Sequence, residues 1–137
     1  MTTLTTFVLF ALAGASASPT SVDTRCFSDA RHKVQLEFRV YSDEGIGWVG
    51  GQVRYRQSKE FIPLVFQHSD VLQDIEGRPS EFEHRWLEVV DGAITGEYRL
   101  TSQGANVYGF RYLNRKTGKA FELPEQSFPD EAGTCRW

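Results

Sequence analysis

The stretch from Val89 to Leu100, VVDGAITGEYRL, is the feature that most limits how this chain can fold. Asp91 and Gly92 stand between two runs that read as strands, and glycine accepts the positive φ of a tight hairpin turn at little cost. After the turn, residues 93–100 alternate between the two faces of a strand. The stretch therefore predicts an antiparallel β-hairpin.

Similar strand patterns, separated by short turns, recur along most of the chain. Alternation is clearest in 34–41 (VQLEFRVY), where every second residue is apolar, as expected for a half-buried strand. Gly50 and Gly51 predict a bulge or sharp bend, and Pro63 predicts an edge or a break. The other segments that read as strands are 46–56, 60–68, 71–75, 82–90, 105–113 and 119–123.

We therefore predict an all-β, single-domain antiparallel meander. Seven or eight strands in about 110 residues favour a closed or nearly closed, calycin-like β-barrel, with a β-sandwich as the alternative. Glycines at 50–51, 96 and 109 favour the barrel, because they allow sharp bends. The total of 137 residues corresponds to one domain.

The segment DGAITGEY (91–98) resembles a strand segment of avidin-type barrels, in which a D-G-x-(Leu/Ile)-T-G-x-Y hairpin recurs. The resemblance covers eight residues and implies a barrel. The rest of the chain lacks the spaced tryptophans of that family, so no biotin site is transferred.

The first residues differ from the rest, because residues 1–17 contain no charged side chain. An apolar run over 7–13 precedes Ala15-Ser16-Ala17, the small-x-small pattern of a signal-peptide cleavage site. The run is too short to span a bilayer. We predict cleavage after Ala17, with Ala15 as the alternative, and no stable membrane insertion afterwards. The protein is expected to be secreted or periplasmic.

The two cysteines, Cys26 and Cys135, lie near the two ends of the remaining chain. In an oxidising compartment such a pair predicts one disulfide. It would close a loop of about 110 residues, worth roughly 4–5 kcal/mol in the chain-entropy model. The expected organisation is an N-terminal segment (18–33) with Cys26, a barrel (34–123) and a C-terminal tail (124–137) tied back by Cys135.

Composition and motifs argue against several function classes. A net charge of −3 does not provide the basic footprint of a nucleic-acid-binding protein. His32, His68 and His84 lack companions at metal-ligand spacing, so no metal or cofactor is expected. His84 alternates with aromatic residues and reads as a partly buried core histidine. Glu81 and Glu83 could form a carboxylate pair, but a solvated strand end is the simpler reading.

Charged residues occupy the faces opposite the apolar ones. If the apolar faces, including Ile94 and Tyr108, point inward, Arg and Glu residues form cross-strand rows on the outer wall. These rows are expected to pair with one another; the alternatives are an arginine-rich patch for an anionic partner or, with the faces reversed, an anion pocket inside. Trp48, beside a glycine-rich bend, is expected to plug a barrel end or to stack on a sugar. The candidate binding residues are Tyr41, Trp48, Arg54, Arg56, Arg99 and Arg111.

No catalytic motif is present in the sequence, so we expect binding rather than catalysis. The first expectation is a small-molecule or glycan binder that uses a barrel mouth. The alternative is a protein-binding module, an inhibitor of a secreted enzyme or an immunity protein. A hydrolase whose site includes His84 and separated carboxylates is a third reading.

Overall fold

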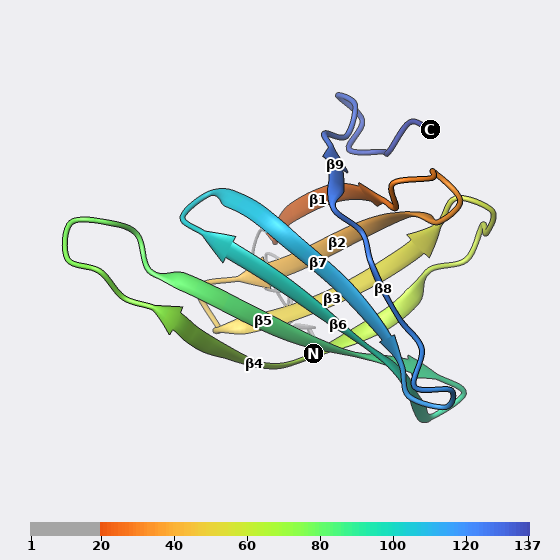
Figure 1. Cartoon of the computed structure of the whole chain (residues 1–137), viewed down its shortest axis with the longest axis horizontal. Helices are drawn as coiled ribbons and strands as arrows, with labels where there is room; N and C mark the ends of the chain where they lie inside the picture. Colours follow the sequence, from red (N-terminus) through yellow and green to blue (C-terminus); the bar gives the residue numbers. More distant parts are fainter. Residues whose placement is uncertain (1–19) are drawn as a thin grey trace, which may run out of the picture.

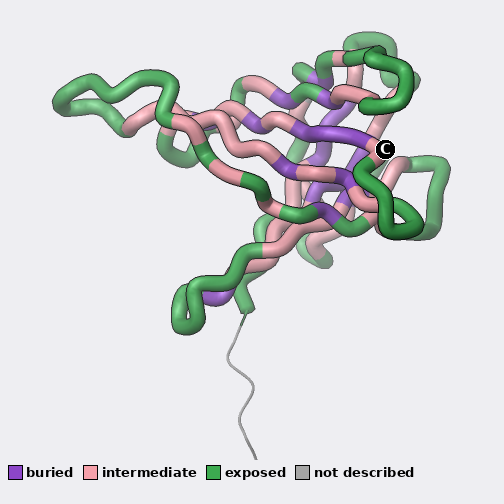
Figure 2. Tube along the Cα trace, turned by 90° about the horizontal axis from the view of Figure 1, so that it is seen from below, coloured by how far each residue is buried: buried purple, intermediate pink, exposed green. Residues whose placement is uncertain are grey.

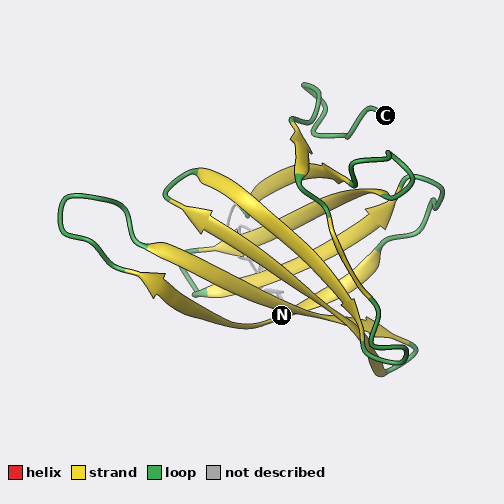
Figure 3. Ribbon diagram, in the orientation of Figure 1, coloured by secondary structure: helices red, strands yellow, loops and turns green. Residues whose placement is uncertain are grey.

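The computed structural model describes residues 20–137, apart from the side chain of Glu125. This part of the chain contains nine strands and no helix, as Figure 3 shows, and hence no helix that could cross a membrane. The predicted signal peptide lies outside the described residues. The strands are β1 (Ser21–Ser28), β2 (Gln35–Asp43), β3 (Trp48–Tyr55), β4 (Ile62–Gln73), β5 (Glu81–Val90), β6 (Ala93–Gln103), β7 (Asn106–Asn114), β8 (Ala120–Glu122) and β9 (Glu125–Ser127).

All nine strands belong to one antiparallel sheet in the order β8-β7-β6-β5-β4-β3-β2-β1-β9. Strands β1 to β8 pair with their neighbours in sequence, so the chain forms a meander. The sheet curls strongly into a half-barrel (Figure 1). The predicted all-β, barrel-like antiparallel fold is confirmed. Strand β1 and strand β9 extend the sheet on both sides of the expected 34–123.

The two edge strands of this sheet are parts of one short segment, residues 120–127. Its first part, β8, pairs with β7, and its second part, β9, pairs with β1. Two residues separate the parts, and the first of them, Leu123, is fully buried and donates its amide to the Phe110 carbonyl at 2.8 Å. One segment therefore bridges the two edges of the curled sheet.

The weakest pairing between long strands lies between β3 and β4. These strands share three residue pairs, centred on Gln52 and Pro63, whereas β4 and β5 share eight. Proline cannot donate a ladder hydrogen bond, which fits the short pairing. Beyond Leu64, β4 is paired with β5 only. Pro63 thus marks a break in pairing, as the sequence predicted.

The hairpin from which the sequence argument started is present. Val90 pairs with Ala93, and the two residues between them, Asp91 and Gly92, have φ of 50° and 75°. Positive φ at both positions is typical of a type I′ turn, whose twist matches that of the strands. The Asp-Gly pair therefore acts as predicted.

Aromatic residues from distant strands fill the centre of the barrel. Phe27 of β1 stacks on Phe110 of β7 with ring centroids 4.1 Å apart, and Phe38 packs edge-on against Trp86 at 5.6 Å. Figure 2 shows the buried residues gathered in the middle of the strands, while turns and hairpin tips are exposed. The fully or nearly fully buried hydrophobic core is Phe27, Leu36, Phe38, Val53, Leu64, Trp86, Tyr98, Leu100, Phe110, Tyr112 and Leu123.

Of the bulge or sharp bend predicted at Gly50 and Gly51, the bulge is absent. The register between β2 and β3 runs without a shift through both glycines. A Cβ on Gly51 would lie 2.8 Å from the Trp86 ring, so the glycine makes room for a core aromatic. Register shifts occur instead elsewhere, and two of them leave Ile94 and Tyr108 half exposed rather than inward.

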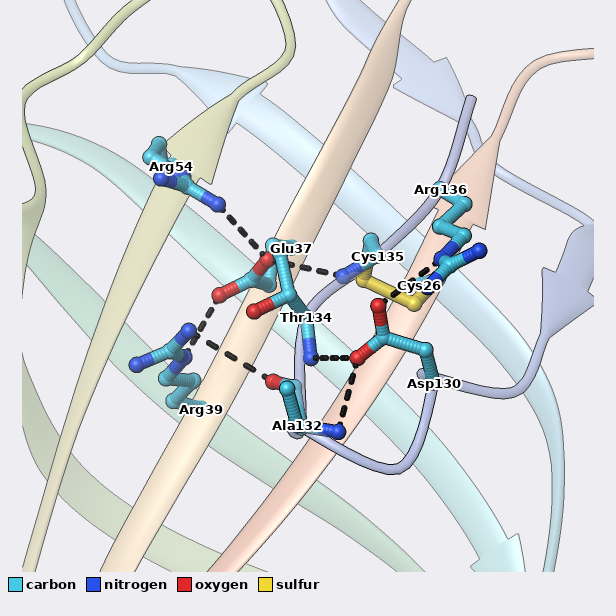
Figure 4. Close-up of a disulfide and its surroundings, with 10 residues drawn as sticks. Cys26, Glu37, Arg39, Arg54, Asp130, Ala132, Thr134, Cys135 and Arg136 are labelled. Atoms are coloured by element: carbon cyan, nitrogen blue, oxygen red, sulfur yellow. Dashed lines mark hydrogen bonds and ion pairs between the residues drawn. A yellow bond between two sulfur atoms is a disulfide. The ribbon is translucent and has the colours of Figure 1, made fainter.

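The predicted disulfide between Cys26 and Cys135 is present, with Cα atoms 5.6 Å apart (Figure 4). It holds the C-terminal tail against the outer face of β1 and β2. The amide of Cys135 donates to the carboxylate of Glu37 at 3.1 Å, and Glu37 also forms ion pairs with Arg39 and Arg54 at 2.5 and 3.0 Å. Glu37 is consequently buried although it belongs to the outer face.

Candidate ligand-binding site

A cavity of about 340 Å³ opens at one end of the barrel, which we call the apolar mouth. The meander places the β2–β3, β4–β5 and β6–β7 turns at this end, on the left in Figure 1. Because strand residues alternate between faces, each strand contributes inward side chains to the wall. The apolar walls are Phe38, Val40, Val49, Phe66, Trp86, Leu100 and Val107.

Three polar side chains converge inside the apolar mouth. The Ser69 hydroxyl lies 2.6 Å from Nδ1 of His84, and Nε2 of His84 lies 3.2 Å from the Ser102 hydroxyl. Both imidazole nitrogens therefore have a hydroxyl partner that can donate or accept. At the rim, Asp23 and Arg25 form an ion pair at 2.8 Å.

A bulge in β4 brings Ser69 to this site. Phe66 pairs with Trp86 but His68 pairs with Arg85, so β4 contains one extra residue at this point. The extra residue reverses the inward and outward alternation. Ser69 consequently faces the cavity together with Phe66, three residues earlier, and lies opposite His84.

The environment of His84 favours its neutral form. Burial in the cavity wall lowers the pKa of His84 below the ordinary value of 6.5. A neutral imidazole offers one donor and one acceptor, as do hydroxyl groups. The polar part of the apolar mouth is therefore uncharged near neutral pH, apart from the Asp23–Arg25 pair at the rim. The expectation of a partly buried histidine is met.

The arginines singled out in the sequence lie on the outer wall, and most are paired with carboxylates. Arg54 pairs with Glu37, Arg99 with Glu97 and Glu83, and Arg111 with Glu122. Arg56 donates to the side-chain carbonyl of Gln35 at 2.6 Å. Cross-strand ion pairing of the outer wall thus occurs as expected. The structure does not bring these arginines together in one cavity.

Glu97 illustrates how the ion pairs of the outer wall, which we call the outer ladder, stabilise an ionised carboxylate. Burial alone would raise the pKa of Glu97, but hydrogen bonds from Arg99 and Arg115 outweigh that effect and lower it. The two contacts are 2.6 and 2.8 Å long. Glu83, expected at a solvated strand end or in a catalytic pair with Glu81, belongs to the same ladder through Arg85 and Arg99.

The two aromatic candidates also lie outside the apolar mouth. Trp48 is half exposed and lies on the face of β3 opposite to Val49. Its ring covers Gly50, since a Cβ added to Gly50 would lie 2.6 Å from the Trp48 ring. It does not plug the barrel end, which corrects that expectation. The Tyr41 hydroxyl, on β2, accepts a hydrogen bond of 2.8 Å from the side-chain amide of Gln52, on β3.

Sequence reasoning missed a further polar group inside the barrel, the carboxylate of Glu88. This side chain is buried and accepts hydrogen bonds from Thr95, Tyr98 and Tyr112 at 2.7, 2.8 and 3.2 Å. Glu88 lies two residues after Trp86, so the alternation of a strand places both side chains on the inward face of β5. That alternation could have predicted an inward Glu88 from the sequence. Ser69 gave no such signal, because the bulge in β4 is not visible in the sequence.

Among the residues that the structure describes, no group of three or more His, Cys, Asp or Glu side chains is placed to hold a metal ion. Comparison of the chain with models of protein families, with curated proteins and with solved structures found no match.

Proposed function

We propose that this protein binds a small, largely apolar molecule in the apolar mouth. The observation that carries the proposal is the cavity itself, whose volume of about 340 Å³ falls within the range of small-molecule sites. Such sites combine apolar walls with a few convergent polar groups. Phe38, Trp86 and Leu100 supply the walls here, and His84 with its two serines supplies the polar group.

The polar group restricts what the ligand carries. A neutral His84 with hydroxyl partners is suited to an uncharged hydroxyl, carbonyl or amide on the ligand. A charged ligand group would lose hydration in the apolar wall without gaining a full opposite charge. The predominance of apolar side chains in the wall favours an apolar molecule over a glycan. We therefore propose a neutral, amphipathic ligand.

The experiment is a fluorescence titration of the oxidised protein with the neutral apolar probe N-phenyl-1-naphthylamine. We expect saturable enhancement that is lost in Val107→Trp, because the larger ring fills the cavity. Val65→Trp is the matched control, since Val65 is half exposed and does not line the cavity. Circular dichroism checks that both variants fold. Absence of saturable binding, or equal binding by the two variants, contradicts the proposal.

A second candidate, a protein-binding module, is favoured by one observation. The β4–β5 hairpin, which projects beyond the barrel in Figure 1, exposes Val71 and Leu72 to at least half of their surface. Adjacent exposed apolar side chains can contribute to a contiguous patch, and such patches mark interaction sites. Affinity capture with the oxidised protein, with Leu72→Asp as the control bait, tests this candidate. Recovery of one stoichiometric protein by the parent bait alone would support it.

A further inference from the structure

The two ends of the barrel carry opposite charge. The β1–β2, β3–β4, β5–β6 and β7–β8 turns lie at the end opposite to the apolar mouth, on the right in Figure 1. Apart from His32, their charged side chains are seven cations, Arg31, Lys33, Arg56, Lys59, Arg115, Lys116 and Lys119, and three anions, Asp29, Glu60 and Asp91. The turns around the apolar mouth contain one cation, Arg78, and three anions, Glu44, Asp74 and Glu76. The overall charge of −3 thus conceals a positive end.

A second cavity, of about 450 Å³, opens at this positive end, and we call it the basic pocket. Its lining combines cations with apolar and amide side chains and includes no carboxylate residue. A cavity lined by one sign of charge concentrates ligands of the opposite sign. The basic pocket is lined by His32, Lys33, Val34, Gln35, Tyr55, Arg56, Gln57 and Phe121.

The cations of the basic pocket are available to a ligand. Within the described part of the chain, neither Lys33 nor Arg56 forms an ion pair, in contrast to most arginines of the outer wall. One nitrogen of Arg56 donates to the amide oxygen of Gln35 at 2.6 Å. This bond holds the guanidinium in place and leaves its other donors for an anion.

The aromatic part of the basic pocket is apolar, and a hydrogen bond holds one of its rings. The Tyr55 hydroxyl lies 2.6 Å from that of Tyr98, which itself donates to Glu88. Since the proton of Tyr98 is directed to the carboxylate, Tyr55 must donate to Tyr98. The Tyr55 hydroxyl therefore has no proton for a ligand, and its ring acts as an apolar surface beside Phe121.

We propose that the basic pocket binds a small organic anion, in which a carboxylate or phosphate is attached to a flat apolar body. The anionic group meets Lys33 and Arg56, and the body rests on Tyr55 and Phe121. Arginine is well suited to this role, because its planar donors match carboxylate and phosphate oxygens. This site is separate from the apolar mouth and takes a ligand of different charge.

The test uses two anionic probes, 2-naphthoate and 2-naphthyl phosphate, with neutral 2-naphthamide as the matched comparison. Binding is followed by amide chemical-shift changes in the oxidised, ¹⁵N-labelled protein. We expect saturable shifts at Lys33, Gln35 and Arg56 with either anion, weaker binding of 2-naphthamide, and lower affinity at high salt. The anion that binds more tightly identifies the preferred headgroup.

Substitutions decide whether anion binding depends on the basic pocket or on the general positive charge of this end of the barrel. Arg56→Gln is expected to weaken anion binding by at least about fivefold, as for loss of a charge-assisted hydrogen bond. Lys59→Gln removes a cation from the same end that does not line the pocket, and binding should stay within about twofold. Equal losses in the two variants, or equal affinity for 2-naphthamide, overturn the proposal. Chemical-shift changes confined to residues of the apolar mouth, such as Val107, also overturn it. If the apolar mouth fails to bind N-phenyl-1-naphthylamine, the proposed function fails, but the test of the basic pocket is unaffected.

Discussion

The hydroxyl of Tyr98 donates a hydrogen bond of 2.8 Å to the carboxylate of Glu88 inside the barrel, where both side chains are buried. Among the described residues no cation pairs with this carboxylate, and hydroxyl groups of Thr95 and Tyr112 complete its shell. A buried charge is tolerated only when its hydrogen-bonding capacity is filled. Tyr98 is central to this arrangement, since it links Glu88 to Tyr55.

Replacement of Tyr98 by phenylalanine should therefore destabilise the fold. The change leaves Tyr55 and Glu88 each without one buried partner, and we expect a loss of about 1–3 kcal/mol in the free energy of unfolding. Tyr41→Phe is the control, because Tyr41 is only partly buried, and a loss of about 0.5 kcal/mol is expected there. Urea unfolding measures both. Equal losses would mean that the buried network contributes nothing beyond an ordinary tyrosine hydroxyl.

Alanine substitutions at the adjacent glycines of β3 should have unequal effects. A Cβ on Gly51 would approach the buried Trp86 ring and the backbone carbonyl of Arg39, at 2.8 and 3.3 Å. A Cβ on Gly50 would meet only the half-exposed Trp48, which can move aside. We expect Gly51→Ala to cost about 1–3 kcal/mol and Gly50→Ala less than about 1 kcal/mol. Thermal unfolding of the two variants would refute this if Gly50→Ala were the more damaging.

Much of the fold could be predicted, because its determinants are local. The hairpin at Asp91 and Gly92 follows from backbone preferences of two residues, and the strand 34–41 from its alternation. The strand β1 has less regular alternation, and its place depends on pairing with β2 and with a segment about 100 residues later. Such long-range pairing leaves little trace in the local sequence, so β1 and β9 were not foreseen.

Loss of the disulfide should lower stability strongly. The bond closes a loop with a sequence separation of 109 residues, and the chain-entropy model gives about 4–5 kcal/mol for such a loop. Cys26→Ser combined with Cys135→Ser is the cleanest variant, because it leaves no free thiol. An unchanged melting temperature in non-reducing buffer would show that the bond does not stabilise the fold.

The carboxylate of Glu37 should matter more than an exposed one. Its side chain is 1% exposed and contacts Arg39, Arg54 and the amide of Cys135. Glu37→Gln keeps the shape but removes the charge, with an expected loss of about 1–3 kcal/mol. Glu122→Gln, in the exposed pair with Arg111, should change stability by less than about 0.5 kcal/mol. A comparable effect of both changes on chemical denaturation would contradict the assigned role of the tail contact.

Stability should fall as the pH drops below about 6.5, through His84. Its pKa is lowered from 6.5 in the folded protein, so the unfolded chain binds more protons in this window. The stabilisation is present above pH 6.5 and decreases as the pH falls towards the folded-state pKa. His84→Gln should show a flatter profile than the parent protein as the pH falls below 6.5. His68→Gln, outside the cavity, serves as the control, and an identical effect of both variants would argue against burial of His84 as the cause.

The candidate site was less predictable than the fold. His84 was found because it interrupts an aromatic alternation, and its partner Ser102 lies two residues beyond Leu100 on the same inward face. Ser69 depends on an extra residue in β4, and the basic pocket depends on the curl that brings Phe121 of β8 close to Tyr55. Pairing of the outer-wall arginines with carboxylates was expected from their alternation with Glu residues, whereas the position of Arg56 in a pocket was not.

Through the bridging segment 120–127, we expect closure of the barrel at β1 to depend on redox conditions. Strand β9 is held on β1 by three residue pairs, one of which contains Cys26, and the disulfide fastens the tail that follows β9 to that same residue. A chain in which this bond has not formed retains the short pairing and the hydrogen bonds of the tail to Glu37 and Arg39, but no covalent link. Release of β9 would uncover the edge of β1, and uncovered strand edges promote self-association. We therefore expect oxidation to protect this protein against aggregation as well as against unfolding.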